Sequence, residues 1–163
     1  GDLVIADTEN HRVQIFSPDG NFKSKFGEKG SKPDQLCYPI GVAVTSADSI
    51  VVTDSVNAAV KIFSPEGQLR KSIVQNTEIE FPHGVAVTRD DDIIVTDICR
   101  HCVTVLTPAG DVSHAFGSYG DGPREFDHPY CVTTNSSKQI IVSDTGNGCV
   151  KIFHFQGRLL RCF

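Results

Sequence analysis

The stretch PHGVAVTRDDDIIVTD, residues 82–97, decides the fold because the chain repeats it. Two further copies are PIGVAVTSADSIVVTD at 39–54 and PYCVTTNSSKQIIVSD at 129–144, and GDLVIAD at 1–7 is a shortened one. A second phrase follows each copy: NHRVQIFSPDG at 10–20, NAAVKIFSPEG at 57–67, RHCVTVLTPAG at 100–110 and NGCVKIFHFQG at 147–157. The aspartates that end the first phrase (Asp7, Asp54, Asp97, Asp144) are 47, 43 and 47 residues apart. The glycines that end the second phrase keep the same intervals, which indicates a repeat protein.

Composition is that of an ordinary globular domain. The 163 residues are 39% hydrophobic and 21% charged, without an apolar run long enough to cross a bilayer. The formal net charge of −5 argues against a broad electrostatic grip on nucleic-acid backbone, although a local basic patch stays compatible with it. The chain begins inside a repeat, so we do not expect Gly1 to be the natural start. We predict no membrane association.

The six cysteines do not form a repeated framework. No cysteine position recurs in all four copies, as a disulfide scaffold of a repeat protein would require. We therefore expect free thiols in a reducing compartment and a cytoplasmic location. They are Cys37, Cys99, Cys102, Cys131, Cys149 and Cys162.

Each full repeat predicts four β-strands and no helix. Short blocks rich in Val and Ile are separated by Gly, Pro, Asp and Ser. The second repeat is expected to form strands at 41–45, 49–53, 60–64 and 68–73, and the third at 84–88, 93–96, 103–107 and 111–116. The fourth gives 131–134, 139–143, 150–154 and 158–162, and the first only 3–6, 13–17 and 21–26. Turns such as Ser17-Pro18-Asp19-Gly20 join the last two strands of a repeat, because proline presets φ and glycine accepts positive φ.

Units of about 45 residues with four antiparallel strands are typical of β-propeller blades. We predict one all-β domain over 1–163, with blades at about 1–38, 39–81, 82–128 and 129–163. The first of these lacks its first strand.

The repeat also resembles a known family. The string P-x-G-V-A-V, then I-V-V-x-D, then N-x-x-V-x-I-F-x-x-x-G, then F-G, resembles the NHL repeat, and DTENHRVQIFSPDGNFKSKFG at 7–27 reads like its consensus. NHL propellers usually close with six blades, so the resemblance implies that this chain covers about three and three-quarter blades of a larger ring. Open terminal blades would expose sheet edges, and we expect the isolated piece to self-associate through them.

The aspartates at the end of the second strand have two readings. Four converging carboxylates (Asp7, Asp54, Asp97, Asp144) could suggest calcium. A residue that every blade needs is usually architectural, so we interpret each as an Asx-type side chain that closes the turn on backbone amides.

Candidate binding residues are found where the repeat is irregular. Turns between second and third strands, and connections between blades, share one face of a propeller, which we call the top. Aromatic and basic residues of these segments form the predicted partner-binding rim: His11, Arg12, Tyr38, His83, Arg100, His101, Tyr119, Arg124, His128 and Tyr130. Such residues stack on single-stranded bases, and they also dominate protein interfaces. Acidic residues share this face: Glu78, Glu80, Asp121, Glu125 and Asp127.

No catalytic constellation is apparent. Cys99-x-x-Cys102 lacks a second ligand pair, and we interpret its cysteines as small buried thiols. The six histidines do not recur at one blade position as axial metal ligands would. We therefore expect no metal, no cofactor and no enzymatic activity, although some related propellers are metal-dependent lyases or lactonases.

The family resemblance implies a function. NHL propellers often form the C-terminal part of tripartite-motif (TRIM-NHL) ubiquitin ligases, where they select a protein or RNA target. We expect the rim to bind a protein substrate or adaptor, with RNA binding by the same face as the alternative. A contiguous positive surface around Lys29, Arg100 and Arg124 would favour RNA, and acidic interruptions would favour protein.

Overall fold

A computed structural model describes residues 1–74 and 79–163 as four antiparallel sheets, without an α-helix in these ranges. The first sheet contains β1 (Leu3–Asp7), β2 (Arg12–Phe16) and β3 (Phe22–Phe26). The second contains β4 (Pro39–Val44), β5 (Ile50–Asp54), β6 (Ala59–Phe63) and β7 (Leu69–Val74). The third contains β8 (Pro82–Val87), β9 (Ile93–Asp97), β10 (Cys102–Leu106) and β11 (Val112–Phe116). The fourth contains β12 (Pro129–Thr134), β13 (Ile140–Asp144), β14 (Cys149–Phe153) and β15 (Leu159–Cys162).

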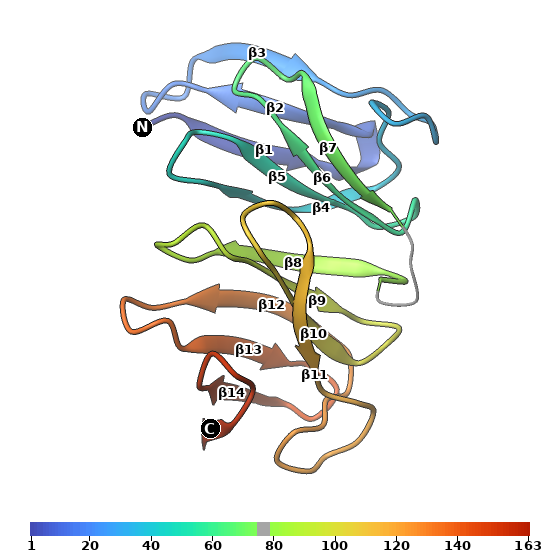
Figure 1. Cartoon of the computed structure of the whole chain (residues 1–163). Coiled ribbons are helices and arrows are strands. Elements are labelled where there is room, and N and C mark those ends of the chain that lie inside the picture. The colour runs from blue at the N-terminus through green and yellow to red at the C-terminus, as the bar shows by residue number, and fades with distance from the viewer. Residues whose placement is uncertain (75–78) are drawn as a thin grey trace.

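The sheets stack as propeller blades. Each is a meander in which strands pair in chain order, and the stack runs from β1–β3 at one end to β12–β15 at the other (Figure 1). The first strands β4, β8 and β12 contact one another in sequence, and β1 contacts β4. The predicted all-β propeller architecture is confirmed. Closure into a six-bladed ring stays a prediction.

Strand limits differ from expectation by one or two residues. Strands β4, β8 and β12 begin at the proline of each repeat, because the proline pairs with the aspartate that ends the next strand. The register then shifts by an extra residue in each of these pairs, which is a bulge. A single 3-10 turn, η1 (Thr8–Asn10), was not anticipated.

The core lies between sheets. Alternate residues of one strand pack on opposite sides: Ile50 and Val52 pack toward the first sheet, whereas Val51 packs toward the third. A further cluster between the third and fourth sheets includes Phe126 and Phe153. Every residue of β5, β6, β9 and β10 is buried, as expected for sheets covered on both faces.

The end sheets are less covered. In β1, Leu3 and Ile5 are 48% and 44% exposed, and among the described strands β2 is the one that pairs with β1. Self-association through such faces stays a prediction. In the described part of the chain, no helix is long and apolar enough to span a membrane.

Glycine at the third position of the repeat permits close packing of the inner strands. A Cβ on Gly41 would lie 2.6 Å from the carbonyl oxygen of His83 in the next sheet. The hydroxyl of Thr53 joins the two strands there, since it accepts from Gly41 N and donates to His83 O, each at 2.7 Å. In the fourth sheet the equivalent residue is Cys131, which is exposed.

Candidate partner-binding rim

The rim predicted from sequence is built from turns, loops and strand ends. It consists of the turns after β1, β5, β9 and β13, the loops at 27–38 and 117–128, and the first residues of β4, β8 and β12. Hydrogen bonds join these parts: Asp54 at the end of β5 accepts from Cys37 N at 2.7 Å, and Asp144 accepts from Asp127 N at 2.7 Å. Glu78 lies outside the described residues.

Buried ion pairs hold the two long loops on this face. The Lys61 ammonium lies 2.7 Å from Oδ2 of Asp54, and both side chains are almost fully buried. The same ammonium donates to the carbonyl oxygen of Gln35 at 2.5 Å, and Asn57 donates to Asp54 at 2.7 Å. Lys61 therefore satisfies a buried carboxylate and a loop carbonyl at once.

The fourth sheet repeats this arrangement 90 residues later. Lys151 lies 2.8 Å from Asp144 and donates to the carbonyl oxygens of Gly122 and Glu125 at 3.1 and 2.6 Å. Burial disfavours the charged form of Asp144, but hydrogen bonds from Lys151, Asn147 and Asp127 N outweigh it, and the pKa of Asp144 is lowered.

The other two aspartates use different partners. Asp97 is buried and accepts four backbone N–H bonds, from Glu80, Phe81, Cys99 and Arg100. Asp7 accepts from the side chains of Asn10, Arg12 and Gln14. In the described ranges, Asp97 is thus the one aspartate of the four that accepts from backbone amides of the turn that follows it. Asp54 and Asp144 instead accept from backbone amides of the loops at 27–38 and 117–128.

Two rim residues, His11 and Tyr38, form a pair at the junction between the first and second sheets. The ring of His11 meets the ring of Tyr38 edge-on, with centroids 4.7 Å apart. Nδ1 of His11 accepts from Tyr38 N at 3.1 Å, and His11 is only 8% exposed. His11 therefore positions Tyr38, which presents its own ring to solvent.

A larger cluster occupies the junction between the third and fourth sheets. The His101 ring meets those of Tyr119 and His128 edge-on, at 4.9 and 4.8 Å. Nδ1 of His128 donates to Asp127 at 2.6 Å. Tyr119 is 68% exposed, the most open aromatic ring among the three tyrosines.

A third pair lies at the start of the inner strands. His83 of β8 stacks on Tyr130 of β12, with centroids 4.6 Å apart and ring planes 13° apart. Burial lowers the pKa of His83, although its Nδ1 donates to the Tyr130 carbonyl at 3.2 Å and partly opposes that effect. The ring is therefore neutral near pH 7 and suits aromatic stacking.

The rim arginines are not grouped. Arg12 pairs with Asp7 at 2.6 Å, whereas the exposed Arg100 and Arg124 lie in the turn after β9 and in the loop at 117–128. A shallow hollow of about 520 Å³ borders Arg124 and Glu125 within that loop. The predicted rim residues thus form three aromatic clusters with separate arginines.

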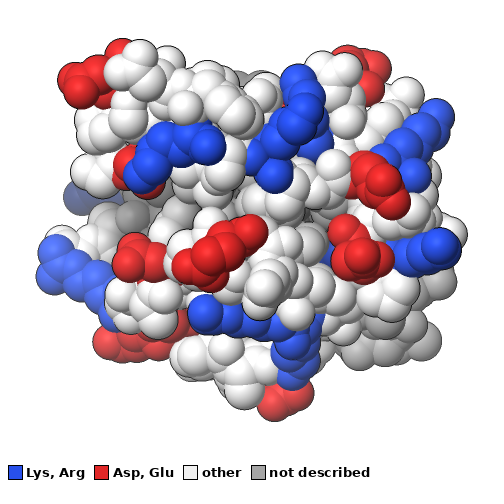
Figure 2. Space-filling model, turned by 90° about the horizontal axis from the view of Figure 1, so that it is seen from above, with Lys and Arg blue, Asp and Glu red and all other residues white. Residues whose placement is uncertain are grey.

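Charge on the molecule is mixed. Figure 2, which views the end of the stack above the first sheet, shows lysine and arginine interspersed with aspartate and glutamate. On the rim, Asp127 lies 2.6 Å from Nδ1 of His128 and 3.9 Å from Nδ1 of His101. An acidic group therefore interrupts the cluster that has the largest number of aromatic rings.

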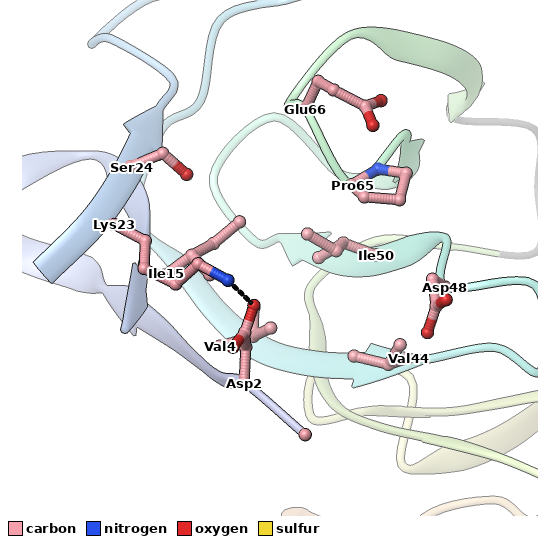
Figure 3. A pocket seen from close by; sticks show the side chains of 11 residues that line it. Asp2, Val4, Ile15, Lys23, Ser24, Val44, Asp48, Ile50, Pro65 and Glu66 are labelled. Carbon is pink, nitrogen blue, oxygen red and sulfur yellow. Dashed lines mark hydrogen bonds and ion pairs between the residues drawn. The ribbon is translucent and has the colours of Figure 1, made fainter. Parts of the chain in front are cut away.

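The larger hollow lies on the opposite face. A groove of about 750 Å³ separates the first and second sheets, over apolar side chains that include Val4, Ile15 and Ile50 (Figure 3). An ion pair between Asp2 and Lys23, at 2.5 Å, spans one side of it. Sequence reasoning placed no site here, because these residues belong to regular strands.

The six cysteines are free. Burial raises the pKa of Cys99 and Cys102, and the Asp97 carboxylate adds to the effect. Burial and the neighbouring Cys162 raise the pKa of Cys149 to about 11. Cys102 is buried as predicted, whereas Cys99 is exposed, because it lies in the turn after β9, so the prediction of a buried thiol is wrong for Cys99.

Two features of the rim were missed from sequence. Lys61 and Lys151 lie within otherwise apolar strands, and the motif V-K-I-F after Asn57 and Asn147 marks both. His11 and His101 are also 90 residues apart, which reveals a period of two blades. The V-K-I-F motif and the 90-residue spacing could have predicted both features, but a comparison of single blades does not detect a period of two blades.

The NHL repeat family matches residues 1–16, 36–63, 80–106 and 126–153, more than half of the chain. One stretch of 52 residues is 54% identical to the Drosophila melanogaster protein brain tumor, over 31% of this chain and 5% of that protein.

Solved structures show the same fold at low identity. Virginiamycin B lyase from Staphylococcus aureus has a TM-score of 0.78 at 17% identity, over 100% of this chain and 52% of its own. U3-55K has a TM-score of 0.78 at 14% identity, over 99% of this chain and 48% of its own. The chain therefore spans about half of these structures, and the likeness concerns the fold alone. Together with the confirmed blade architecture, the repeat match establishes that the chain belongs to the NHL repeat family.

Proposed function

We propose that this chain is a non-catalytic recognition module that binds a protein substrate or adaptor through the rim. The observation that supports it most is the set of three aromatic clusters held on hydrogen-bonded turns of one face. Their exposed members are Tyr38, Tyr119 and Tyr130, at 37%, 68% and 40%. Rigid aromatic side chains bury large areas at low entropic cost, which is why they dominate protein interfaces.

Charge favours protein over RNA. The chain has a net charge of −5, and Asp127 interrupts the histidine cluster. RNA binding is the second candidate, because exposed tyrosine rings and the exposed Arg100 and Arg124 belong to the same rim, and such residues suit stacked bases. Within a longer protein, the module would select the target of a TRIM-NHL-like ubiquitin ligase in the cytoplasm, where free thiols persist.

One comparison tests both candidates. A rim variant (Tyr119→Ala with Arg124→Ala) and a matched variant of the opposite face (Phe22→Ala with Arg89→Ala) change the same kinds of exposed residue. Cross-linking in cells followed by mass spectrometry should recover protein partners with the wild type and the opposite-face variant, and lose them with the rim variant.

RNA is tested with a randomised single-stranded pool at two salt concentrations. Enrichment that weakens with salt and disappears in Arg100→Ala would replace the protein proposal by RNA recognition. Partners that survive the rim variant would reject this face as the binding surface.

A further inference from the structure

Three donors of metal-ligand type converge at the junction between the third and fourth sheets. His101 ends the turn after β9, and Asp127 with His128 immediately precedes β12. Their ligand atoms all lie within 4.8 Å of one another. Within residues 1–74 and 79–163, this is the one group of three His, Cys, Asp or Glu side chains with that property.

The backbone holds these donors in place. His101 and His128 adopt left-handed φ values of 53° and 52°, which non-glycine residues rarely adopt. Asp127 N donates to the buried Asp144 at 2.7 Å. In the metal-free chain His128 N donates to Nδ1 of His101 at 3.1 Å, a bond that coordination through this nitrogen would replace.

The fold itself does not require two of the three donors. At the equivalent junction 90 residues earlier, His11 accepts from Tyr38 N at the same 3.1 Å, and both residues have φ of 54°. There, Cys37 and Tyr38 occupy the positions of Asp127 and His128. The histidine of the turn is thus architectural at both junctions, whereas the Asp-His pair occurs at the junction between the third and fourth sheets and not at the one between the first and second.

We propose that His101, Asp127 and His128 bind a zinc ion. Two imidazoles and a carboxylate are common zinc ligands, with a fourth tetrahedral position for water or another ligand. The half-exposed side chains leave that position open to solvent: the exposed fractions of Asp127 and His128 are 27% and 53%.

The distances require only small adjustments. Ligands about 2.0–2.2 Å from a tetrahedral zinc lie about 3.4 Å apart. The present distances from Oδ1 of Asp127 are 3.9 Å to Nδ1 of His101 and 2.6 Å to Nδ1 of His128, so one must shorten and the other lengthen by less than about 1 Å. Nδ1 of His128 transfers its proton to Nε2 or to solvent, and Nδ1 of His101 exchanges the His128 amide for the metal.

The ion would fasten the turn after β9 to the loop at 117–128. That loop carries Tyr119, whose ring contacts His101, and Arg124. Zinc would therefore order the part of the rim that has the most exposed aromatic ring. This site can exist whether or not the rim binds the proposed partner.

The test is direct titration of the metal-free chain with Zn²⁺ by calorimetry, and with Co²⁺ by absorption. We expect one equivalent to bind, with a tetrahedral Co²⁺ spectrum that lacks a thiolate band. His128→Tyr introduces the residue type that the chain itself uses at the equivalent position, Tyr38, so it should preserve the fold. It should weaken zinc binding at least about tenfold. His154→Ala removes a histidine of the opposite face and should bind like the wild type.

A second variant tests whether the same three ligands are sufficient. Cys37→Asp combined with Tyr38→His places an Asp-His pair beside His11, as at the junction between the third and fourth sheets, and it should bind a second equivalent of zinc. The proposal is overturned if the wild type fails to bind Zn²⁺ at millimolar concentration, if His128→Tyr binds equally well, or if the Co²⁺ spectrum shows thiolate ligation.

Discussion

Replacing Lys61 by methionine should strongly destabilise the chain. The Lys61 side chain is 2% exposed, and its ammonium lies 2.7 Å from Asp54 and also donates to the loop carbonyl of Gln35. Methionine keeps most of the apolar stem volume, so the main effect is a carboxylate left buried without its cation. Such an uncompensated charge costs about 3–5 kcal/mol. Asp54 would retain the bonds from Cys37 N and Asn57, which are not enough to replace a full charge.

Urea unfolding followed by circular dichroism measures this loss. With a slope of about 1–3 kcal/mol per molar urea, the midpoint should fall by more than about 1 M. Lys138→Met is the matched control, because Lys138 pairs with Asp90 and Asp92 but stays 34% exposed, and exposed pairs contribute little. Adding Asp54→Asn to Lys61→Met removes the stranded charge and should restore most of the midpoint.

Two outcomes would refute this reasoning. If Lys61→Met is no more harmful than Lys138→Met, water already screens the pair. If the double variant is as unstable as Lys61→Met alone, the effect belongs to packing or to the loop carbonyls instead of the buried charge.

Further predictions concern the fourth sheet and the inner strands. Because the folded-state pKa of Asp144 is lowered, its stabilisation is present above the ordinary carboxyl pKa of about 3.9 and is lost as pH falls through the lowered value. Urea midpoints measured between pH 5 and pH 2 (roughly the range over which such carboxylates titrate) should therefore fall more steeply in the wild type than in Asp144→Asn, and parallel curves would contradict this assignment. Gly41→Ala should cost about 1–3 kcal/mol, since the new Cβ would lie 2.6 Å from His83 O. Cys131→Ala at the equivalent exposed position should leave the stability almost unchanged in the same urea assay. Equal losses of stability in the two variants would show that the close approach of β4 and β8 at Gly41 is not the cause.

Much of the fold follows from local pattern. Alternating apolar residues, Pro-Gly turns and a repeat of about 45 residues predicted blade architecture, and each described strand lies within two residues of expectation. Local chemistry determines these features, because turn residues and strand periodicity act over a few neighbouring positions. The predicted top face likewise followed from strand order alone.

The arrangement within that face required tertiary structure. The sequence predicted that His11, His83 and His101 belong to one rim, but their environments differ: His11 is buried beneath Tyr38, and His83 stacks on Tyr130. Contacts between segments 27 and 47 residues apart decide these environments. No local pattern encodes such distances.

The sequence by itself therefore determined the repeat and the blades, and it predicted which residues belong to the rim. Only the tertiary structure decided that Lys61 and Lys151 neutralise buried aspartates and that His101, Asp127 and His128 converge. The physical reason is that packing one sheet on the next brings together a turn and a loop from different blades. Electrostatic and coordination chemistry depends on those distances, whereas strand formation depends on neighbours along the chain.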